Sequence, residues 1–501
     1  LHNLFDELQI EKGEKIAIMG RNTSHWAIAY VAIVTYGGVV VPILPDFKED
    51  EVLNILEHSE SVLALMNDKL FAPLENTNIP HLKGIYSLVD FNVLQGENIP
   101  QYAEVEKMQP DDLVCNPLPG DVLGVLSYTS GTSGFSKGVM LTAHNLYSNV
   151  QFGLDTLTLK KGGEVLSFLP LAHAFGCAFE FLWPFCAGAP IHFVEKIPSP
   201  SLLVKAFKEI RPAIIFMVPL IIEKIYKKQL QPVLESPKMR ILLRIPILKQ
   251  FVYKKIRKKL TDTFGGNFYQ MIIGGAALNP EVEAFLQKIG FPFTVGYGMT
   301  ECAPLISYVD WKHFKKQSCG KVVHRMQMKI DSDYAENHVG EILVKGENVM
   351  LGYYKNEDAT KEVLRKDGWL RTGDLGIIDK SGLLFIRGRS KNMILGASGQ
   401  NIYPEEIEAT VNNVPMIMES VVVDDDEHRI VALVYPDPDY CAEQGWDTAE
   451  KIAEQLEDER KNINAQLPAY KQIFKMVVVD TEFEKTPKRS IKRYLYNDYA
   501  K

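Results

Sequence analysis

The stretch YTSGTSGFSKGVM, residues 128–140, follows directly on the apolar run VLGVLSY, residues 122–128, which predicts a buried strand. It contains three glycines, five serines or threonines, and Lys137. Glycines let several backbone N–H groups turn toward one point, hydroxyls add donors and a lysine adds positive charge. The loop is not a Walker A motif, because Gly138 rather than Ser or Thr follows Lys137. We interpret it as a polyphosphate-binding loop; the alternative is a flexible surface loop.

Strands and helices alternate along the first three quarters of the chain. KIAIMG (15–20), EVLSFLP (164–170), AIIFMVP (213–219) and FYQMIIGG (268–275) have the pattern of buried strands. Helices are predicted between them, one opened by Ser24 as N-cap and one by Asn279 with Pro280 at its first position. This alternation predicts an α/β fold, with a large N-terminal domain of packed sheets flanked by helices.

The pattern changes beyond residue 388. A helix (PEEIEATVNN), a hairpin (VVVDDDEHRIVALVYP), a long helix (TAEKIAEQLEDERKNINAQLP) and a strand (IFKMVVVD) follow one another. They predict a small α+β domain over 389–501, after a large domain over 1–388, with a hinge near 389–391. The polar stretch 95–112 is expected to be a surface connection.

Composition excludes several classes of protein. The 501 residues are 46% hydrophobic and 24% charged, which is ordinary for a globular protein. A net charge of −8 argues against nucleic acid as the partner. Six cysteines without a CxxC pair predict no disulfide framework or zinc site and favour the reducing cytoplasm. The uncharged run 26–45 is broken by Gly37-Gly38 and Pro42, which favours a buried helix and strand over a membrane span.

Three further motifs carry polar side chains after apolar runs. GYGMTE (296–301) offers an aromatic ring for a base and a carboxylate for magnesium; an ordinary turn is the alternative. TGDLG (372–376) places an acid after a tight turn, where it can accept ribose hydroxyls or merely cap the turn. IRGRSKNMILGASGQNIYPEEIE (386–408) gathers positive charge at the expected domain boundary, through Arg387, Arg389 and Lys391, as a charged hinge or a solvated linker.

In this order and spacing, the four motifs resemble those of the adenylate-forming superfamily, which contains acyl-CoA synthetases, peptide-synthetase adenylation domains and firefly-type luciferases. The resemblance covers nearly the whole chain. PLAHAFG (170–176), GGAAL (274–278) and GYGMTECAPLI (296–306) are most similar to the long-chain fatty acyl-CoA synthetase branch. Members react a carboxylate with ATP to give an acyl-adenylate and pyrophosphate. They then transfer the acyl group to a thiol and release AMP.

The resemblance implies a role for each motif residue. The phosphates of ATP would be held by Thr129, Ser130, Gly131, Thr132, Ser133, Gly134 and Lys137. Tyr297 would stack on adenine beside Gly275 and Ala276. Thr300 would contact the α-phosphate, and Glu301 would bind Mg²⁺. Asp374 would bind the ribose, with Arg389 nearby.

The same resemblance assigns the second half-reaction. Lys391 matches the hinge about which the small domain rotates between the half-reactions. Gly399 matches the glycine that lines the channel for the pantetheine arm of coenzyme A. His173 matches the residue that closes over the acyl group or gates the thiol; a satisfied core histidine is the alternative.

The C-terminal motif departs from the family pattern. In EKTPKRSIKRYLY (484–496), Ser490 stands where the family has a lysine that neutralises the carboxylate and α-phosphate. A gapped alignment offers Lys492 instead, and Lys488 lies two residues before Ser490. Both lysines are therefore candidate catalytic residues.

A basic stretch lies between Lys224 and Lys259, with twelve Lys or Arg and one acid, Glu235. Its apolar residues recur at helical spacing, which predicts a basic amphipathic helix. Peripheral contact with an anionic membrane surface is one interpretation, and a solvated face packed on the domain is the other.

From the resemblance we expect an enzyme that activates a medium-chain or long-chain fatty acid with ATP and Mg²⁺ and transfers it to coenzyme A. Two alternatives are a ligase that uses acyl carrier protein and a homologue with impaired catalysis that binds nucleotide or acyl groups. The protein is expected in the cytoplasm, with peripheral contact at the inner membrane surface as a further expectation. The first residues, LHNLFDELQIEKGEK, have the pattern of the later part of a helix, so we expect residues before them to be missing.

Overall fold

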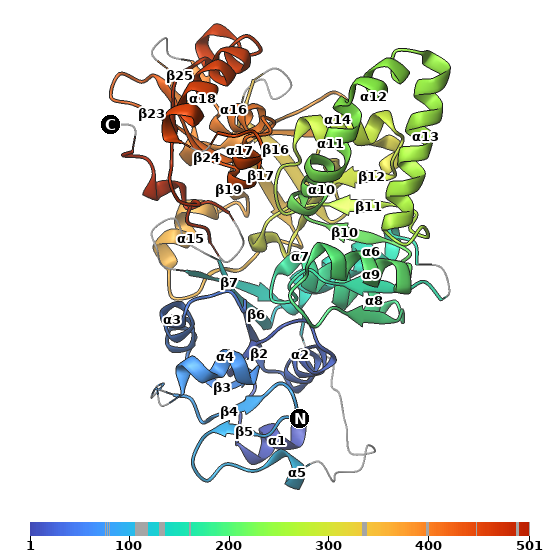
Figure 1. Cartoon of the computed structure of the whole chain (residues 1–501). Coiled ribbons are helices and arrows are strands. Elements are labelled where there is room, and N and C mark those ends of the chain that lie inside the picture. Colours follow the sequence, from blue (N-terminus) through green and yellow to red (C-terminus); the bar gives the residue numbers. More distant parts are fainter. Residues whose placement is uncertain are drawn as a thin grey trace.

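The structure is a computed structural model of the whole chain. It describes residues 1–499 except for 76, 78, 80, 106–118, 130–135, 160–161, 333–337, 397–399, 447 and 487–489. In Figure 1 the colours follow the chain, and the C-terminal part, in red, lies next to β16 (Met326–Asp331), β17 (Gly340–Gly346) and β19 (Leu370–Ile378).

The first layer is an eight-stranded sheet with the order β18-β7-β6-β2-β1-β3-β4-β5. Its strands are β1 (Lys15–Met19), β2 (Val39–Ile43), β3 (Ser61–Met66), β4 (Gly84–Ser87), β5 (Val93–Gln95), β6 (Leu123–Thr129), β7 (Lys137–Thr142) and β18 (Gly352–Tyr353). The centre, from β6 to β4, is parallel, and its strands are almost wholly apolar because both faces are covered. The helices are α1 (His2–Glu7), α2 (Ser24–Tyr36), α3 (Glu49–Ser59), α4 (Asp68–Phe71), α5 (Tyr102–Val105) and α6 (Ala143–Thr156).

A second group of elements forms parallel sheets from β8 to β12. The strands are β8 (Val165–Ser167), β9 (Ile191–Phe193), β10 (Ile215–Met217), β11 (Met271–Ile273) and β12 (Phe293–Val295). The helices are α7 (Ala174–Gly176), η3 (Cys177–Leu182), α8 (Trp183–Cys186), α9 (Pro200–Ile210), α10 (Pro219–Ile225), η4 (Tyr226–Leu230), α11 (Gln231–Glu235), α12 (Pro237–Leu242), α13 (Pro246–Thr263) and α14 (Pro280–Lys288). Asn279 caps α14 by accepting from the backbone N–H of Glu281 at 2.9 Å, as expected from the sequence.

Antiparallel strands then lead to the small domain. They are β13 (Tyr297–Gly298), β14 (Leu305–Tyr308), β15 (Lys321–Val322), β16 (Met326–Asp331), β17 (Gly340–Gly346), β19 (Leu370–Ile378) and β20 (Leu384–Arg389). Short helices η5 (Thr300–Cys302), η6 (Trp311–His313), α15 (Glu357–Val363) and η7 (Ser390–Asn392) lie among them or follow β20.

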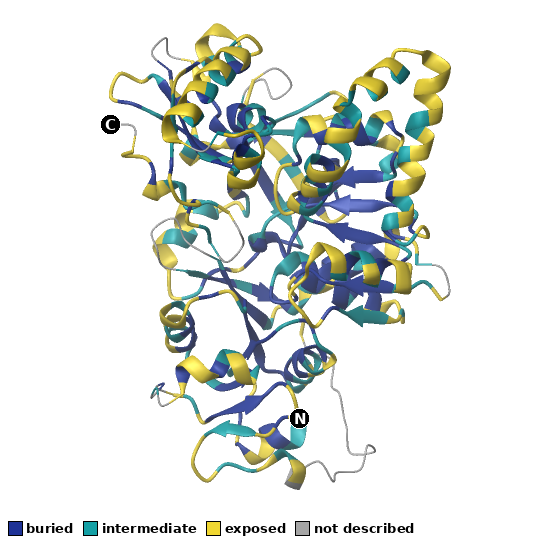
Figure 2. Ribbon diagram, viewed as in Figure 1, coloured by how far each residue is buried: buried dark blue, intermediate teal, exposed yellow. Residues whose placement is uncertain are grey.

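The C-terminal part has its own core on both faces of one sheet. The sheet is β23 (Ile417–Asp424), β24 (Ile430–Pro436) and β25 (Ile473–Val478); β21 (Ile394–Leu395) and β22 (Asn401–Ile402) pair separately. The helices are α16 (Pro404–Val411), α17 (Pro438–Glu443), α18 (Ala449–Asn464), η8 (Ala469–Lys471) and η9 (Arg493–Leu495). Along β24, Ala432 and Val434 join one apolar cluster while Val431 and Leu433 join the other. Figure 2 shows this buried sheet under an exposed outer helical surface.

The expected α/β class, with a large domain and a smaller C-terminal domain, is confirmed. The buried core of the large domain runs from Leu4 to Leu384, and the next core begins at Ile394. One detail was wrong: Thr23 rather than Ser24 is the N-cap of α2, since its side chain accepts from the N–H of Trp26 at 3.1 Å. The run 26–45 forms most of α2 and then β2. Among the described residues, no helix combines the length and apolar character that crossing a membrane requires.

Two other predicted segments have a mixed outcome. The polar connection 95–112 lies partly outside the described residues, because the description stops between 106 and 118. The basic stretch 224–259 is not one helix: it runs from the end of α10 through η4, α11 and α12 into α13.

Candidate active site

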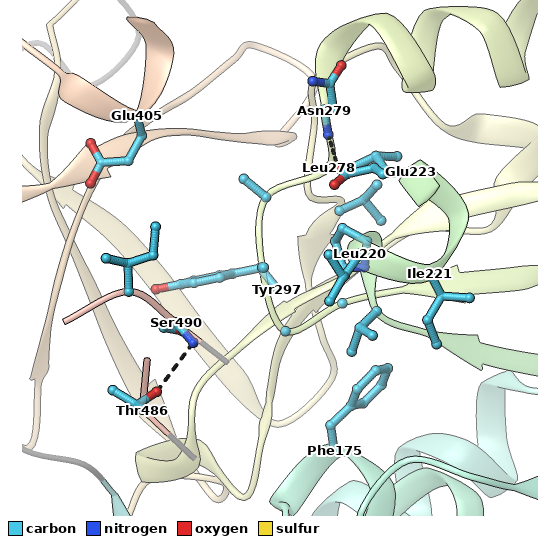
Figure 3. A pocket seen from close by; sticks show the side chains of 18 of the residues that line it. Phe175, Leu220, Ile221, Glu223, Leu278, Asn279, Tyr297, Glu405, Thr486 and Ser490 are labelled. Carbon is cyan, nitrogen blue, oxygen red and sulfur yellow. Dashed lines mark hydrogen bonds between the residues drawn. The ribbon is translucent and has the colours of Figure 1, made fainter. Parts of the chain in front are cut away.

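A cavity of about 2810 Å³ separates the large domain from the small one. Its walls come from the ends of β11 and β13, from β19 and β20, and from α16 and residues 485, 486 and 490–494 of the small domain. Figure 3 shows Tyr297 extending across this cavity, with Thr486 and Ser490 on the facing wall and Phe175 below. Elements from distant parts of the sequence therefore share one chamber.

Three of the residues predicted to bind the nucleotide interact directly through a hydrogen bond and an ion pair. The hydroxyl of Tyr297 donates to Oδ2 of Asp374 at 2.6 Å, and Nε of Arg389 lies 3.0 Å from Oδ1. Register explains the second contact, because Asp374 on β19 pairs with Arg389 on β20. Burial raises the pKa of the Asp374 carboxyl, and the guanidinium of Arg389 opposes this shift. The cluster positions an aromatic ring beside a hydrogen-bonded carboxylate.

Two more expected residues meet through a tyrosine that sequence reasoning missed. The ammonium of Lys137 lies 4.8 Å from the ring centroid of Tyr353. The hydroxyl of Tyr353 donates to Oε1 of Glu301 at 2.9 Å. Pairing of β18 with β7 brings Tyr353 next to Lys137. The only advance signal was the aromatic pair in LGYYKN, which has no distinctive motif.

The loop predicted to bind polyphosphate is described only at its ends. Thr129 closes β6 and pairs with Lys137 at the start of β7, so the loop joins two antiparallel strands at the cavity. The predicted phosphate ligands Ser130, Gly131, Thr132, Ser133 and Gly134 lie outside the described residues, as do Lys488 and Gly399.

The described side chains of the cavity could bind magnesium only together with oxygen atoms of a bound substrate. The described residues contain no cluster of three or more His, Cys, Asp or Glu side chains that could hold a metal ion. Glu301 alone would supply one carboxylate, with Oε1 already bonded to Tyr353. Magnesium commonly binds through one or two carboxylates, phosphate oxygens and water, so Glu301 fits such a shared site.

Backbone geometry accounts for the glycine at the predicted adenine edge. Gly275, two residues after the end of β11, has φ +88°, a left-handed conformation that disfavours side chains. Gly275 and Ala276 are exposed and line the cavity, as do Tyr297 and the buried Thr300. Exposed backbone is thus available in the same cavity as the Tyr297 ring.

His173 caps α7, and its Nδ1 accepts from the N–H of Phe175 at 3.2 Å.

Two buried polar residues hold the turn that precedes α7, and sequence reasoning missed both. Asn22 donates to the carbonyl of Leu169 at 2.7 Å and accepts from the N–H of Leu171 at 3.0 Å. Glu180 accepts from the N–H of Leu169 at 2.8 Å. A lone acid in the apolar run CAFEFL was the available signal.

The apolar end of the cavity is lined by two of the five aromatic residues in the run 175–185. Phe175 and Phe179 line it, together with Phe216 and Ile221. Phe181 and Trp183 are instead buried in the core, and Phe185 is exposed, so these three do not line the cavity. Helical geometry separates them, because successive residues of η3 and α8 point in different directions.

Lys391, the predicted hinge residue, and Lys492, the candidate C-terminal lysine, line the same cavity. Lys391 is exposed in η7, and the hydroxyl of neighbouring Ser390 donates to the carbonyl of Gly373 at 3.1 Å. Lys492 lines the cavity, but its ammonium is 2.7 Å from Oε1 of Glu484, which raises the pKa of Lys492. Ser490 also lines the cavity.

The small domain is held in this orientation by contacts with α16. The ammonium of Lys227, in η4, donates to the carbonyls of Asn412, Val414 and Ile417 beyond the end of that helix. Asn279 donates to Oδ1 of Asn413 at 2.6 Å. Burial lowers the pKa of Lys227. Nothing in the sequence separated Lys227 from the other basic residues around it.

The sequence profile of the AMP-binding enzyme family matches residues 2–354, and that of the AMP-binding enzyme C-terminal domain matches 391–501. The chain therefore belongs to the AMP-binding enzyme family, the adenylate-forming superfamily that its motifs resemble.

Its relatives belong to the long-chain acyl-CoA synthetase branch. Long-chain-fatty-acid–CoA ligase FadD15 of Mycobacterium bovis is 29% identical over 470 residues, covering 88% of this chain and 75% of that protein. The peroxisomal long chain acyl-CoA synthetase 6 of Arabidopsis thaliana is 30% identical over 493 residues, covering 88% and 67%. Long-chain-fatty-acid–CoA ligase ACSBG2 of Gallus gallus is 27% identical over 478 residues. The match covers 86% of this chain and 61% of the Gallus gallus protein.

Solved structures share the fold. The anthranilate CoA ligase AuaEII in complex with anthranoyl-AMP has a TM-score of 0.81 at 20% identity, covering 100% of this chain and 90% of that one. The o-succinylbenzoate CoA synthetase of Bacillus subtilis in complex with ATP and magnesium has a TM-score of 0.76 at 22% identity, covering 99% and 92%.

Proposed function

We propose that this protein is an ATP-dependent fatty acyl-CoA synthetase. It joins a medium-chain or long-chain fatty acid to AMP and then transfers the acyl group to coenzyme A. The observation that carries the proposal is the bonded cluster of Tyr297, Asp374 and Arg389 in a cavity that also contains Lys137 and an apolar end.

The nucleotide would lie along the polar wall. The ring of Tyr297 offers a stacking surface for adenine beside Gly275 and Ala276. Asp374 can accept hydrogen bonds from ribose hydroxyls, since a carboxylate has about four acceptor positions and the structure uses two. Thr129 and Lys137 face the phosphates from the strand ends, and Thr300 lies beside Glu301.

Magnesium, when bound with ATP at Glu301, would neutralise part of the phosphate charge. Neutralisation is needed because the attacking carboxylate and the triphosphate repel each other. A carboxylate oxygen of the fatty acid attacks the α-phosphorus, and pyrophosphate leaves with the electrons of the broken P–O bond. Holding the two anions in line supplies most of the rate enhancement.

The acyl chain fits the apolar end of the cavity. Phe175, Phe179, Phe216 and Ile221 line it, and each methylene that leaves water contributes about 0.8 kcal/mol. Such a lining favours a long apolar chain over a short or charged acid.

The second half-reaction uses a different arrangement of the domains. We infer that the small domain, beginning at residue 389, rotates about Lys391 and brings Gly399 to the thiol channel, while His173 gates the acyl group. The thiolate of coenzyme A attacks the acyl carbonyl carbon, and AMP leaves. Holo-acyl carrier protein presents the same thiol chemistry, so it is the alternative acceptor.

Fatty-acid-dependent exchange of labelled pyrophosphate into ATP tests the first step. We expect exchange that increases from short to long carboxylic acids, followed by thioester formation with coenzyme A. Thioester formation only with holo-acyl carrier protein would replace coenzyme A as acceptor.

A second candidate function rests on Ser490, because a serine at the family's lysine position carries no positive charge. It is a homologue that binds nucleotide and acyl groups without efficient adenylation. Absence of exchange with every acid, together with measurable ATP binding, would establish this function and reject the synthetase.

A further inference from the structure

The strongest unassigned feature is a basic arm, which we define as residues 237–259, formed by α12 and most of α13. It contains nine Lys or Arg and no Asp or Glu, in a chain whose net charge is −8. Among the described residues, Lys258 is the one of these nine in an ion pair, with Asp262 at 2.7 Å. Figure 1 places α12 and α13 at one edge of the molecule, and Figure 2 shows them as mostly exposed.

Large apolar side chains are exposed on the same arm. The exposed fractions are 82% for Ile247, 67% for Phe251 and 63% for Ile241. Ile245 and Leu248 are also exposed. Side chains of this kind in contact with water mark an interaction surface when they are grouped rather than scattered.

The packing of α13 does not require these side chains. Tyr253, Ile256 and Leu260 recur at helical spacing and face the core of the large domain. Ile247 and Phe251 lie near the start of α13 and α12 precedes them, where the structure leaves them uncovered. The arm therefore has one apolar face that packs on the large domain. It also has a separate exposed apolar tip, formed by Ile241, Ile247 and Phe251.

We propose that the basic arm docks on the surface of an anionic phospholipid bilayer. Ile241, Ile247 and Phe251 insert at the boundary between headgroups and acyl chains, and the surrounding Lys and Arg contact anionic headgroups. Cationic side chains next to exposed Ile and Phe are the combination that holds an interfacial helix on such a surface.

Charge argues against the other occupants. A second copy of the arm would bring nine further positive charges against the first nine, which repel each other. Nucleic acid would satisfy the charge but would leave Ile241, Ile247 and Phe251 without an apolar partner. A bilayer surface satisfies both features.

The arm is continuous with the cavity at both of its ends. Before it, α10 and η4 contribute Ile221 and Tyr226 to the lining; after it, Thr263 and Phe264 do the same. An arm seated on a bilayer would thus place the cavity beside a surface into which acyl chains partition. Docking itself does not depend on the proposed function, since it is measured without ATP or coenzyme A.

The test is co-sedimentation of the full chain with vesicles. We expect binding to phosphatidylcholine mixed with phosphatidylglycerol at low salt, and at least about tenfold weaker partitioning onto phosphatidylcholine alone. Raising the salt to about 0.5 M should weaken binding to the anionic vesicles, because the charges are exposed.

Matched variants separate the arm from general charge and hydrophobicity. The double variant Lys249→Glu, Lys254→Glu should lose at least about tenfold in partitioning, whereas Lys69→Glu, Lys312→Glu, with the same net charge, should not. Ile247→Ser with Phe251→Ser should weaken binding, and Ile28→Ser, at a side chain 51% exposed on α2, should not.

Three results would overturn the proposal. The first is absence of binding to anionic vesicles at low salt. The second is equal loss in the arm variants and their controls. The third is a dimer in solution that dissociates in the Ile247→Ser, Phe251→Ser variant, which would assign the tip to a second copy. Thermal unfolding of each variant should match the parent protein, because every altered side chain is exposed.

Discussion

The hydroxyl of Tyr297 donates a 2.6 Å hydrogen bond to Asp374, and this bond joins β13 of the large domain to β19, whose neighbour β20 ends at Arg389. A ring that stacks on adenine needs no hydroxyl, whereas the buried carboxylate gains a donor from it. Tyr297→Phe should therefore change the KM for ATP by less than about threefold, and Tyr297→Ala should raise it at least about tenfold. Pyrophosphate exchange at varied ATP measures both.

The free energy of unfolding of the Tyr297→Phe variant measures the contribution of the hydroxyl separately from that of the ring. Tyr297→Phe removes a donor to a buried carboxylate and should cost about 1–3 kcal/mol of unfolding free energy. If Tyr297→Ala leaves the KM for ATP unchanged, Tyr297 has no role in binding the base.

The contact of Lys227 with the C-terminal end of α16 predicts a selective effect on the two half-reactions. In this orientation Ser490 lines the same cavity as Tyr297, and we infer that the proposed adenylation uses this orientation. Lys227→Met keeps the aliphatic chain but removes the ammonium that binds three carbonyls. We expect adenylation to slow at least about tenfold, since hydrogen bonds from a charged donor contribute about 1.5–3 kcal/mol.

The neighbour Lys228 supplies the control, because it is exposed on the same helix. Lys228→Met should leave both half-reactions unchanged. Thioester formation from preformed acyl-AMP should not fall in Lys227→Met; an equal fall in both steps would mean that the contact only stabilises the fold.

Local sequence patterns predicted much of the fold because strands and caps depend on nearby residues. The strand before the phosphate loop and the Asn279 cap are examples, and both are present. Contacts between distant segments could not be predicted in this way. Tyr353 joins Lys137 to Glu301 only because β18 pairs with β7, more than 200 residues away in the sequence.

The aromatic run 175–185 shows the same limit. Phe179 and Phe181 are both buried aromatic residues of η3, yet Phe179 lines the cavity and Phe181 does not. Lys227 and Lys228 are adjacent and identical in type, yet among the described residues only Lys227 donates to the small domain. Side-chain direction, rather than residue type, separates the two.

Lys492 is a candidate for the missing catalytic charge, and its pairing with Glu484 allows a sharp test. Lys492→Ala should slow adenylation at least about tenfold if the ammonium leaves Glu484 to reach the phosphate. Glu484→Gln removes the carboxylate charge but keeps the lysine, so exchange should be retained. Rapid-quench assays of adenylation and of thioester formation from acyl-AMP measure the two steps.

Two comparisons complete this test. Lys488→Ala examines the other lysine, which lies outside the described residues. Equal losses in Lys492→Ala and Glu484→Gln would identify a structural ion pair, and unchanged exchange in both lysine variants would remove both candidates. Ser490→Lys, which restores the family residue, should then accelerate exchange.

Glu283 makes the stability of the large domain depend on pH. Burial raises its pKa to about 7 from an ordinary value of 4.5, although its Oε1 accepts from the N–H of Gln317 at 2.7 Å. Between pH 4.5 and 7 the unfolded chain loses this proton while the folded chain keeps it, so stability falls as the pH rises. The full cost above pH 7 is about 3 kcal/mol.

Glu283→Gln removes this titration and keeps an oxygen that can accept from Gln317. We expect the variant and the parent protein to differ little at pH 4.5, and the variant to be more stable by about 1–3 kcal/mol at pH 8. Urea unfolding at the two pH values measures the difference. Glu209→Gln, at an exposed carboxylate on α9, should show no such gain. A Glu283→Gln variant that loses stability as the pH rises, in parallel with the parent protein, would show that another group causes the dependence.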